Sequence, residues 1–322
     1  MKRIVALLLA VLLTAVVAGA ALAEESADVR VASLKGPTSM GLVKLMQDND
    51  AGSVDQSYSF TLSGTADEIV PLLTRGELDI AMVPCNLASV LYNNTKGQVR
   101  LLAVNTLGVL YIVENGESIN TVADLAGKTI YSTGKGTTPE FALNYILAKN
   151  GLDASKDVTI EYKSEATEVL AALTADAAAV GVLPQPYVTA ALMQNESLRI
   201  ALSLSDEWDK VSDGSRMITG VAVARAAFVE EHPEAVAAFM KDYAASIEYV
   251  NANPSEAAQW VVDLGIVAKA PIAEKALPGC NIVYIDGEEM KTAVSGYLEA
   301  LYEQEPKSVG GALPDEAFYY IP

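Results

Sequence analysis

Strand and helix patterns alternate along this chain and start again about 100 residues later, and this repetition limits the possible folds more than any other feature. Short runs of apolar, β-branched residues are typical of buried strands, and apolar residues three or four positions apart are typical of helices. Their alternation predicts an α/β fold, because strand–helix–strand units form mainly parallel sheets with helices on their faces. Two successive units predict two similar lobes.

The two units align without a gap when the first is shifted by 100 residues. The first contains strands at 29–34 and 79–83, and the second contains strands at 129–132 and 179–183. Of the fifty positions from 35 to 84, eight are identical in this alignment. We therefore expect each lobe to have a strand–loop–helix turn at the carboxyl end of its sheet.

The first 23 residues are typical of a secretory signal peptide. Lys2 and Arg3 precede an uncharged apolar run over 4–18, and Ala21-Leu22-Ala23 is a small-x-small cleavage site. The alternative is an uncleaved membrane anchor, but the run is short for a span of about 20 residues. We expect cleavage after Ala23, and a periplasmic or secreted protein that has no lipid-attachment cysteine near the cleavage site.

Composition excludes several classes of function. The formal net charge of −19 repels phosphate backbones and argues against nucleic-acid binding. One histidine and two cysteines are too few for a zinc or His/Cys cluster, so we expect no metal and no cofactor. If the protein is exported, Cys85 and Cys280 can form a disulfide. The alternative is two separate buried thiols.

Three segments that suggest catalysis or ion binding have simpler structural explanations. Gly127–Thr129 lacks the earlier glycine of a phosphate loop, because position 122 is valine, and it leads into a strand. His232 precedes Pro233, a residue that suits the first turn of a helix. Asp286, Glu288 and Glu289 lack the spacing of a calcium loop and fit the N-terminus of a helix. We therefore expect no catalytic residue.

The loops Lys35–Ser39 and Lys135–Pro139 are the strongest candidates for a binding site. Each is expected to end a strand and open a helix, where free backbone N–H groups and the helix dipole suit an anion or a polar group. Ligands of open α/β sheets bind outside the carboxyl ends of the strands. Ordinary helix capping by threonine or serine explains any one of these residues equally well.

Four segments, in this order, resemble the substrate-binding proteins of ABC importers, in the nitrate, sulfonate, taurine and thiamine-precursor group. They are Gly76-Glu77-Leu78-Asp79-Ile80-Ala81, the stretch 122–130 (VADLAGKTI), the stretch 228–236 (FVEEHPEAV), and the tail with Val309-Gly310-Gly311 and Pro314-Asp315. The resemblance implies the type II periplasmic-binding-protein fold. It also implies two hinge crossings, near 105–108 and 212–218, between a first lobe of 24–107 with 216–322 and a second lobe of 108–215.

The resemblance also implies a function. The protein would hold a small polar or anionic ligand between its lobes and deliver it to an ABC permease with its ATPase subunit, as a monomer without enzymatic activity. Two alternatives remain: a protein that presents its ligand to a membrane sensor, and a small-molecule enzyme on the same fold. The predicted ligand-binding residues lie in the two turns and the other strand-end loops: Lys35, Gly36, Pro37, Thr38, Ser39, Gly64, Thr65, Pro84, Cys85, Asn86, Thr133, Gly134, Lys135, Gly136, Thr137, Thr138, Gln185 and Tyr187.

The signal peptide generates the first testable prediction. N-terminal sequencing of the exported protein should begin at Glu24, because signal peptidase cleaves after a small-x-small site. The mature chain would then have 322 − 23 = 299 residues. A chain that stays in the cytoplasm with Met1 intact would contradict the prediction.

Overall fold

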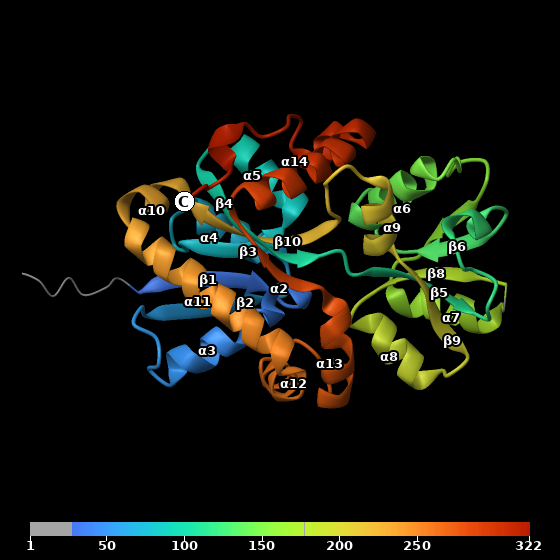
Figure 1. The fold of residues 1–322 in the computed structure, drawn as a ribbon, viewed down its shortest axis with the longest axis horizontal. Helices are drawn as coiled ribbons and strands as arrows, with labels where there is room; N and C mark the ends of the chain where they lie inside the picture. The colour runs from blue at the N-terminus through green and yellow to red at the C-terminus, as the bar shows by residue number, and fades with distance from the viewer. Residues whose placement is uncertain (1–27, 177) are drawn as a thin grey trace, which may run out of the picture.

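The computed structural model describes residues 28–176 and 178–322, and it consists of two α/β lobes side by side (Figure 1). The predicted signal peptide and its cleavage site lie outside the described residues. Within the described part of the chain, no helix is both long and apolar enough to cross a membrane.

The first lobe is built on a six-stranded sheet in the order β11-β4-β10-β3-β1-β2. Its strands are β1 (Val29–Leu34), β2 (Tyr58–Ser63), β3 (Ile80–Pro84), β4 (Val99–Leu107), β10 (Ile218–Arg225) and β11 (Ile282–Ile285). Its helices are α2 (Pro37–Met40), α3 (Val43–Asp50), α4 (Ala66–Thr74), α5 (Cys85–Asn94), α10 (Ala226–Glu231), α11 (Pro233–Ala252), α12 (Pro254–Asp263), α13 (Ala270–Ala276) and α14 (Gly287–Gln304), with 3₁₀ turns η2 (Leu277–Cys280), η3 (Pro306–Val309) and η4 (Glu316–Phe318).

The second lobe is built on a five-stranded sheet in the order β7-β6-β8-β5-β9. Its strands are β5 (Leu110–Asn115), β6 (Thr129–Ser132), β7 (Thr159–Tyr162), β8 (Val180–Pro184) and β9 (Leu198–Ser203). Its helices are α6 (Thr138–Lys149), α7 (Ala166–Ala175), α8 (Tyr187–Gln194) and α9 (Leu204–Val211), with the 3₁₀ turn η1 (Val122–Leu125).

The sequence repeat corresponds to a structural repeat. In each lobe the three parallel strands have the same order, β2-β1-β3 in the first and β7-β6-β8 in the second. The strands β3 and β8 lie 100 residues apart at both ends. The repeated strand–helix–strand unit therefore forms the parallel half of each sheet.

Both sheets are mixed, whereas the sequence indicated mainly parallel sheets. The strand β10 pairs antiparallel with β3 and β4, and β5 pairs antiparallel with β8 and β9. The reason is the connection between the lobes. Each of these two strands enters its sheet from the other lobe, at the carboxyl ends of the parallel strands, and must run against them.

The helix expected after β1 is divided into α2 and α3 at Gly41 and Leu42. The hydroxyl of Ser246, from α11, donates to Gly41 O at 2.6 Å and accepts from Leu45 N at 2.9 Å. A β-carbon at Gly41 would lie 2.7 Å from a side-chain carbon of Ile247. The Ser246 hydroxyl of α11 therefore takes the place of a helical hydrogen bond between Leu45 N and Gly41 O at this break.

An apolar core extends from the first lobe into the second. The indole of Trp208 in α9 stacks on Tyr145 of α6, with ring centroids 4.0 Å apart, and lies 5.5 Å from the ring of Tyr297 in α14. All three helices belong to one continuous hydrophobic cluster. The thiols of Cys85 and Cys280 are both buried and free, and burial raises the pKa of Cys280 to about 12.

The buried carboxylate of Asp79 forms two ion pairs that join three strands of the first lobe, at the end away from the second lobe. Asp79 accepts from Arg30 Nε at 2.8 Å and Nη2 at 2.7 Å, and from Arg225 Nη2 at 2.7 Å. Burial raises the pKa of Asp79, but the hydrogen bonds from the two arginines outweigh it and hold that pKa below its usual range. The carboxylate thus joins β1, β3 and β10.

We expect Asp79→Asn to lower the free energy of unfolding by about 1.5–3 kcal/mol, the usual contribution of hydrogen bonds to charged groups. Because the pKa of Asp79 is depressed in the folded protein, its contribution is present at neutral pH and is lost as the pH falls below about 4. Chemical denaturation at pH 7 and pH 3 measures both effects. The control Glu77→Gln changes an exposed pair with Arg75 and should change stability by less than about 1 kcal/mol.

Candidate functional site

The carboxyl ends of the parallel strands in the two sheets face each other across the connection between β4 and β5. Gly220 of β10 pairs with Pro84 at the end of β3 and with Thr106 near the end of β4. Only Gly108 and Val109 separate β4 from β5, and Leu110 pairs with Pro184 at the end of β8. The strand-end loops of both lobes therefore surround the same junction, where open α/β sheets bind ligands.

The junction itself is tightly packed. The carbonyl of Gly108 accepts hydrogen bonds from Ser205 Oγ at 2.9 Å and from Asn281 Nδ2 at 2.5 Å. A β-carbon at Gly108 would lie 2.3 Å from Ser205 Oγ and 2.7 Å from Met217 Sδ. Residues 212–217 connect α9 back to β10, so the two crossings between the lobes lie beside each other here.

In the first lobe, the turn after β1 places Thr38 against a group of buried polar side chains. Thr38 is 8% exposed. Asn105 Nδ2 reaches Thr38 O at 3.5 Å, and Asn105 Oδ1 accepts from Thr106 Oγ1 at 3.0 Å. A β-carbon at Gly220 would lie 3.1 Å from Thr38 Oγ1, so the absence of a side chain there leaves room for this threonine.

Tyr243 of α11 lies beside the same group. Its hydroxyl is buried and has no hydrogen-bond partner among the described residues. Burial raises the pKa of Tyr243, and the nearby Asn105 side chain partly offsets that rise. A buried hydroxyl without a partner is uncommon in native proteins, which makes this position a candidate for contact with a ligand.

In the second lobe, the turn after β6 satisfies several of its own polar groups. Glu140 accepts from Gly136 N at 2.5 Å, and Thr137 Oγ1 donates to Gly134 O at 2.5 Å. The Lys135 amine lies 5.8 Å from the centre of the Tyr162 ring. These contacts leave the hydroxyl of Thr138 as the polar side chain of this turn that faces the other lobe.

Thr138 approaches Tyr297 of α14, in the first lobe. The hydroxyl of Tyr297 is buried and, like that of Tyr243, has no hydrogen-bond partner in the described part. Burial raises the pKa of Tyr297, with a small opposing effect from Thr138. The second turn therefore contributes a threonine beside a buried tyrosine, and the first contributes one beside Asn105, the neighbour of Tyr243.

The 100-residue alignment does not hold within the turns. Ser39 donates through N and Oγ to Gly36 O, and Thr137 donates in the same way to Gly134 O. These equivalent bonds lie 98 residues apart. Thr38 and Thr138 are therefore not at equivalent positions, although both lie at the interlobe edge.

The remaining predicted residues are placed as follows. Asn86 Nδ2 donates to Ser308 O at 3.2 Å, and Cys85 is buried beside it. Gln185 Oε1 accepts from Thr189 Oγ1 at 2.8 Å, and Tyr187 begins α8. Lys35, Gly64 and Thr65 are exposed, and Gly36, Pro37, Thr133 and Pro84 are half-buried at the strand ends.

Two contacts outside the predicted set join the lobes. Tyr111 OH donates to Gly279 O at 2.6 Å, and Gln304 Nε2 donates to Phe141 O at 3.0 Å. Sequence reasoning missed Tyr111, Gln304, Tyr243 and Tyr297, because only tertiary packing brings them to the interlobe edge and no local residue pattern indicates it. Asn105, in contrast, lies within the segment that the family resemblance assigned to the first crossing.

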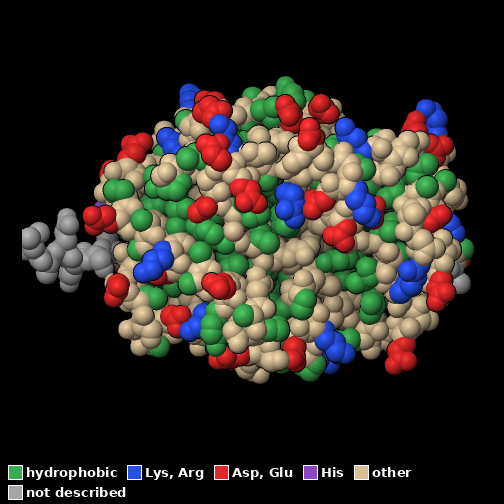
Figure 2. Space-filling view, in the orientation of Figure 1, with side chains coloured by type: hydrophobic (Ala, Val, Ile, Leu, Met, Phe, Trp, Pro, Cys, Tyr) green, Lys and Arg blue, Asp and Glu red, His purple; other side chains and the backbone are tan. Residues whose placement is uncertain are grey.

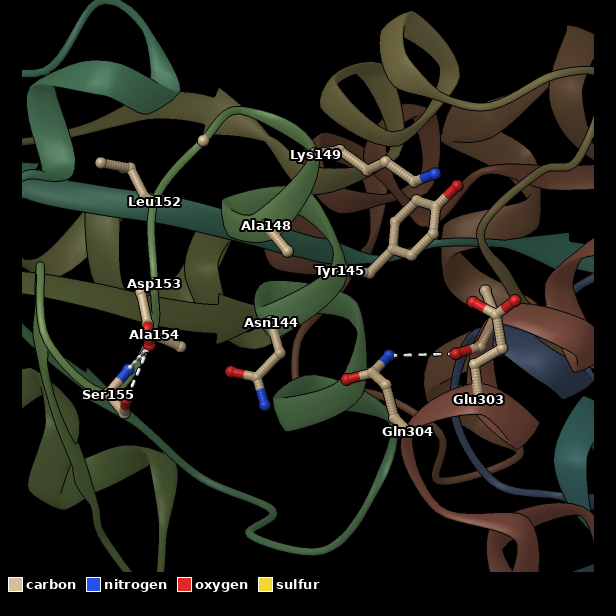
Figure 3. Close-up of a pocket in the computed structure, with 12 residues that line it drawn as sticks. Asn144, Tyr145, Ala148, Lys149, Leu152, Asp153, Ala154, Ser155, Glu303 and Gln304 are labelled. Carbon is tan, nitrogen blue, oxygen red and sulfur yellow. Dashed lines mark hydrogen bonds between the residues drawn. The ribbon is translucent and has the colours of Figure 1, made fainter.

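Two neighbouring cavities lie between α6 of the second lobe and α14 of the first. One, of about 540 Å³, is lined by Gly136, Glu140, Phe141, Asn144, Gln304 and Glu305. The other, of about 710 Å³, shares Asn144 and Gln304 with it and continues to Lys149 and the loop 151–155 (Figure 3). Of the predicted site residues, only Gly136 lines either of these cavities.

Comparison with known proteins gives a family and a set of similar folds. The family model described as NMT1/THI5 like matches residues 96–257, half of the chain. No curated protein sequence matches this chain.

Several solved structures share the fold over almost the whole chain. An ABC transporter protein from Parabacteroides distasonis is 27% identical, with a TM-score of 0.76 over 92% of this chain and 98% of that one. The periplasmic aliphatic sulphonate binding protein of Escherichia coli is 16% identical, with a TM-score of 0.71 over 92% of each chain. The alkanesulfonate-binding protein of Xanthomonas axonopodis pv. citri, bound to MOPS, is 16% identical, with a TM-score of 0.61 over 91% of this chain and 96% of that one.

The interlobe contact at Gly279 generates a prediction. A β-carbon there would lie 2.7 Å from Gln185 Nε2 and 3.3 Å from Tyr111 OH. Gly279→Val should therefore hold the lobes further apart and increase the radius of gyration measured by small-angle X-ray scattering without ligand. Gly64→Val is the control, since nothing lies within 4 Å of a β-carbon there. Equal radii for both variants and the unmodified protein would contradict the prediction.

Proposed function

Because this chain belongs to the NMT1/THI5-like family, we propose that it is an extracytoplasmic solute-binding protein that captures a small ligand between its lobes and delivers it to an ABC importer. The observation that carries this proposal is the facing arrangement of the strand-end loops around two crossings. The similar fold of the 27% identical ABC transporter protein supports it. The proposed lobes are 24–107 with 216–322, and 108–215.

Ligand binding would favour closure because the site draws groups from both lobes. Thr38 belongs to the first lobe, and Thr138 belongs to the second. A ligand that contacts both threonines binds the closed form more tightly than the open form, and this difference in affinity shifts the population toward closure. The partner that would recognise the closed form is then an ABC permease with its ATPase subunit.

The groups at the interlobe edge suit binding rather than turnover. Thr38, Asn105 and Thr138 offer hydroxyl and amide hydrogen bonds, which recognise a ligand without forming a covalent bond. The single histidine, His232, is exposed between α10 and α11, with its ring 5.3 Å from Phe228. It lies in the surface connection of two helices, at the helix start that the sequence indicated.

Export and a monomeric state complete the proposal. Cleavage after Ala23 would release a protein of net charge −21, because 20 basic and 41 acidic side chains remain. Such a charge keeps an exported protein soluble. Native mass spectrometry of the purified mature protein tests the whole proposal: it should show one copy of the chain that retains a small ligand.

Calorimetric titration with that retained ligand tests the two threonines. Removing one hydroxyl hydrogen bond to an uncharged group costs about 0.5–1.5 kcal/mol. Thr38→Ala and Thr138→Ala should each weaken binding by roughly two- to tenfold, at 1.4 kcal/mol per factor of ten. The exposed Thr74, at the C-terminal end of α4 and away from the strand-end loops, gives the control Thr74→Ala, with no expected effect. Unchanged affinity in both variants would leave these threonines as residues of the first helical turns with no role in binding.

A further inference from the structure

The loop before α6 already binds a carboxylate from its own chain. Glu140 accepts from Gly136 N at 2.5 Å. This amide belongs to the loop Lys135–Pro139, which the sequence indicated as a site for an anion or a polar group, and it lies two residues before the 12-residue helix α6. Helix N-termini favour negative charge, and here Glu140 supplies it. An arriving anion would have to displace the Glu140 carboxylate or lie beside it.

Carboxylates also dominate the two cavities between α6 and α14. Glu140 and Glu305 line the smaller cavity. Glu303 and Asp153 line the larger one, where Lys149 is the cation among the lining residues (Figure 3). Asp153 is paired with Lys156, so the net negative charge lies in the smaller cavity, which borders the loop before α6.

The lysines of the two turns do not reverse that charge. Lys135 lies over the ring of Tyr162, and the Glu140 carboxylate lies beside the same tyrosine. Burial raises the pKa of Tyr162, and Glu140 raises it further. Lys135 and Glu140 thus both lie near Tyr162, and Lys135 forms no ion pair with Glu140 in the described part of the chain. The Lys35 amine lies near Gly265, just beyond the C-terminal end of α12, where helix carbonyls favour a cation.

The buried ion pairs are remote from the site. Asp79 binds its arginines at the amino ends of β1 and β3, and Glu114 binds Arg199 at the outer end of the second sheet. On the face shown in Figure 2, acidic side chains lie over both lobes with basic ones between them. Neither the local charges nor the acidic surface favours the entry of an anion.

What the interlobe edge does offer is uncharged hydrogen-bonding groups. The Tyr297 hydroxyl is fully buried and without a partner in the described chain, and it lies beside Thr138 in the same turn as Glu140. The Tyr243 hydroxyl is in the same situation beside Asn105. Buried hydroxyls of this kind can bind an uncharged acceptor or donor without a counter-charge.

We propose that Glu140 is a specificity-determining residue that excludes anions from the ligand site, so that the ligand is an uncharged or cationic small molecule bound through the hydroxyls of Thr138 and Tyr297. This inference rests on the proposed function and concerns the same cleft. It distinguishes this chain from the sulfonate-binding proteins whose fold it shares.

Calorimetric titration with ethanesulfonate tests the exclusion. Glu140→Gln removes the charge but keeps an oxygen that accepts from Gly136 N, and it should raise the affinity for ethanesulfonate at least tenfold over the unmodified protein. Glu140→Ala also frees the amide and should raise the affinity further. Ethanesulfonamide, an uncharged analogue of similar shape, should show no such gain in either variant.

Asp124→Asn is the matched control. Asp124 also accepts from backbone amides, those of Asn120 at 2.9 Å and Thr121 at 2.8 Å, but it lies before β6, at the strand end away from the cleft. Its loss should leave the affinity for ethanesulfonate unchanged. A gain of equal size in Asp124→Asn would show a general effect of net charge and would overturn the proposal.

Other outcomes also decide between the two proposals. Equal affinity of the unmodified protein and Glu140→Gln for ethanesulfonate, or no binding by either, overturns the role of Glu140. If native mass spectrometry finds a retained anion, the solute-binding function stands and the exclusion of anions falls. If the protein retains no ligand, the solute-binding function itself fails.

Discussion

The short connection at Gly108 and Val109 is the constraint on which the rest of the structure depends. Since two residues separate β4 from β5, the edge at which β4 ends must face the edge at which β5 begins. The Gly108 carbonyl is held by Ser205 on one side and by Asn281 on the other, and no β-carbon fits at this glycine. The parallel strands β1, β3, β6 and β8 consequently direct their carboxyl ends toward one junction, and every candidate ligand group lies there because of it.

The sequence predicted the repeated part of the fold well and the connecting part poorly. Strands β3 and β8 keep the 100-residue spacing because each is a buried strand between two helices, where an insertion would displace the apolar face. The strands β5, β9 and β11 were not predicted, and they determine that the sheets are mixed. The direction of such a strand depends on whether the chain enters the sheet from the same lobe or from the other one. No local residue pattern indicates this.

The candidate site was predictable as a place but not as a set of contacts. Strand–turn–helix patterns indicated the two turns, since the carboxyl edge of an α/β sheet follows from element order alone. Whether an amide is free at such a turn depends on side chains that fold back on it, as Glu140 does on Gly136. The tyrosines at 243 and 297 come from helices more than 100 residues away from the nearest turn, and only tertiary packing brings them to the edge.

The two sides of the lobe interface differ in chemistry, and the difference bears on how the lobes separate. Beside α14, the rings of Tyr145, Trp208 and Tyr297 form part of one apolar core, and exposing such a surface costs about 25 cal/mol per Å². Beside η2, the contact is a hydrogen bond from Tyr111 to Gly279, and water can replace it at a net cost of about 0.5–1.5 kcal/mol. Separation at η2 should therefore cost less, and we expect the lobes to open at the side of Gln185 and to stay in contact along α14. Such a movement would keep Glu140 and Tyr297 near each other in both states, while the groups near Gln185 would meet their partners only on closure.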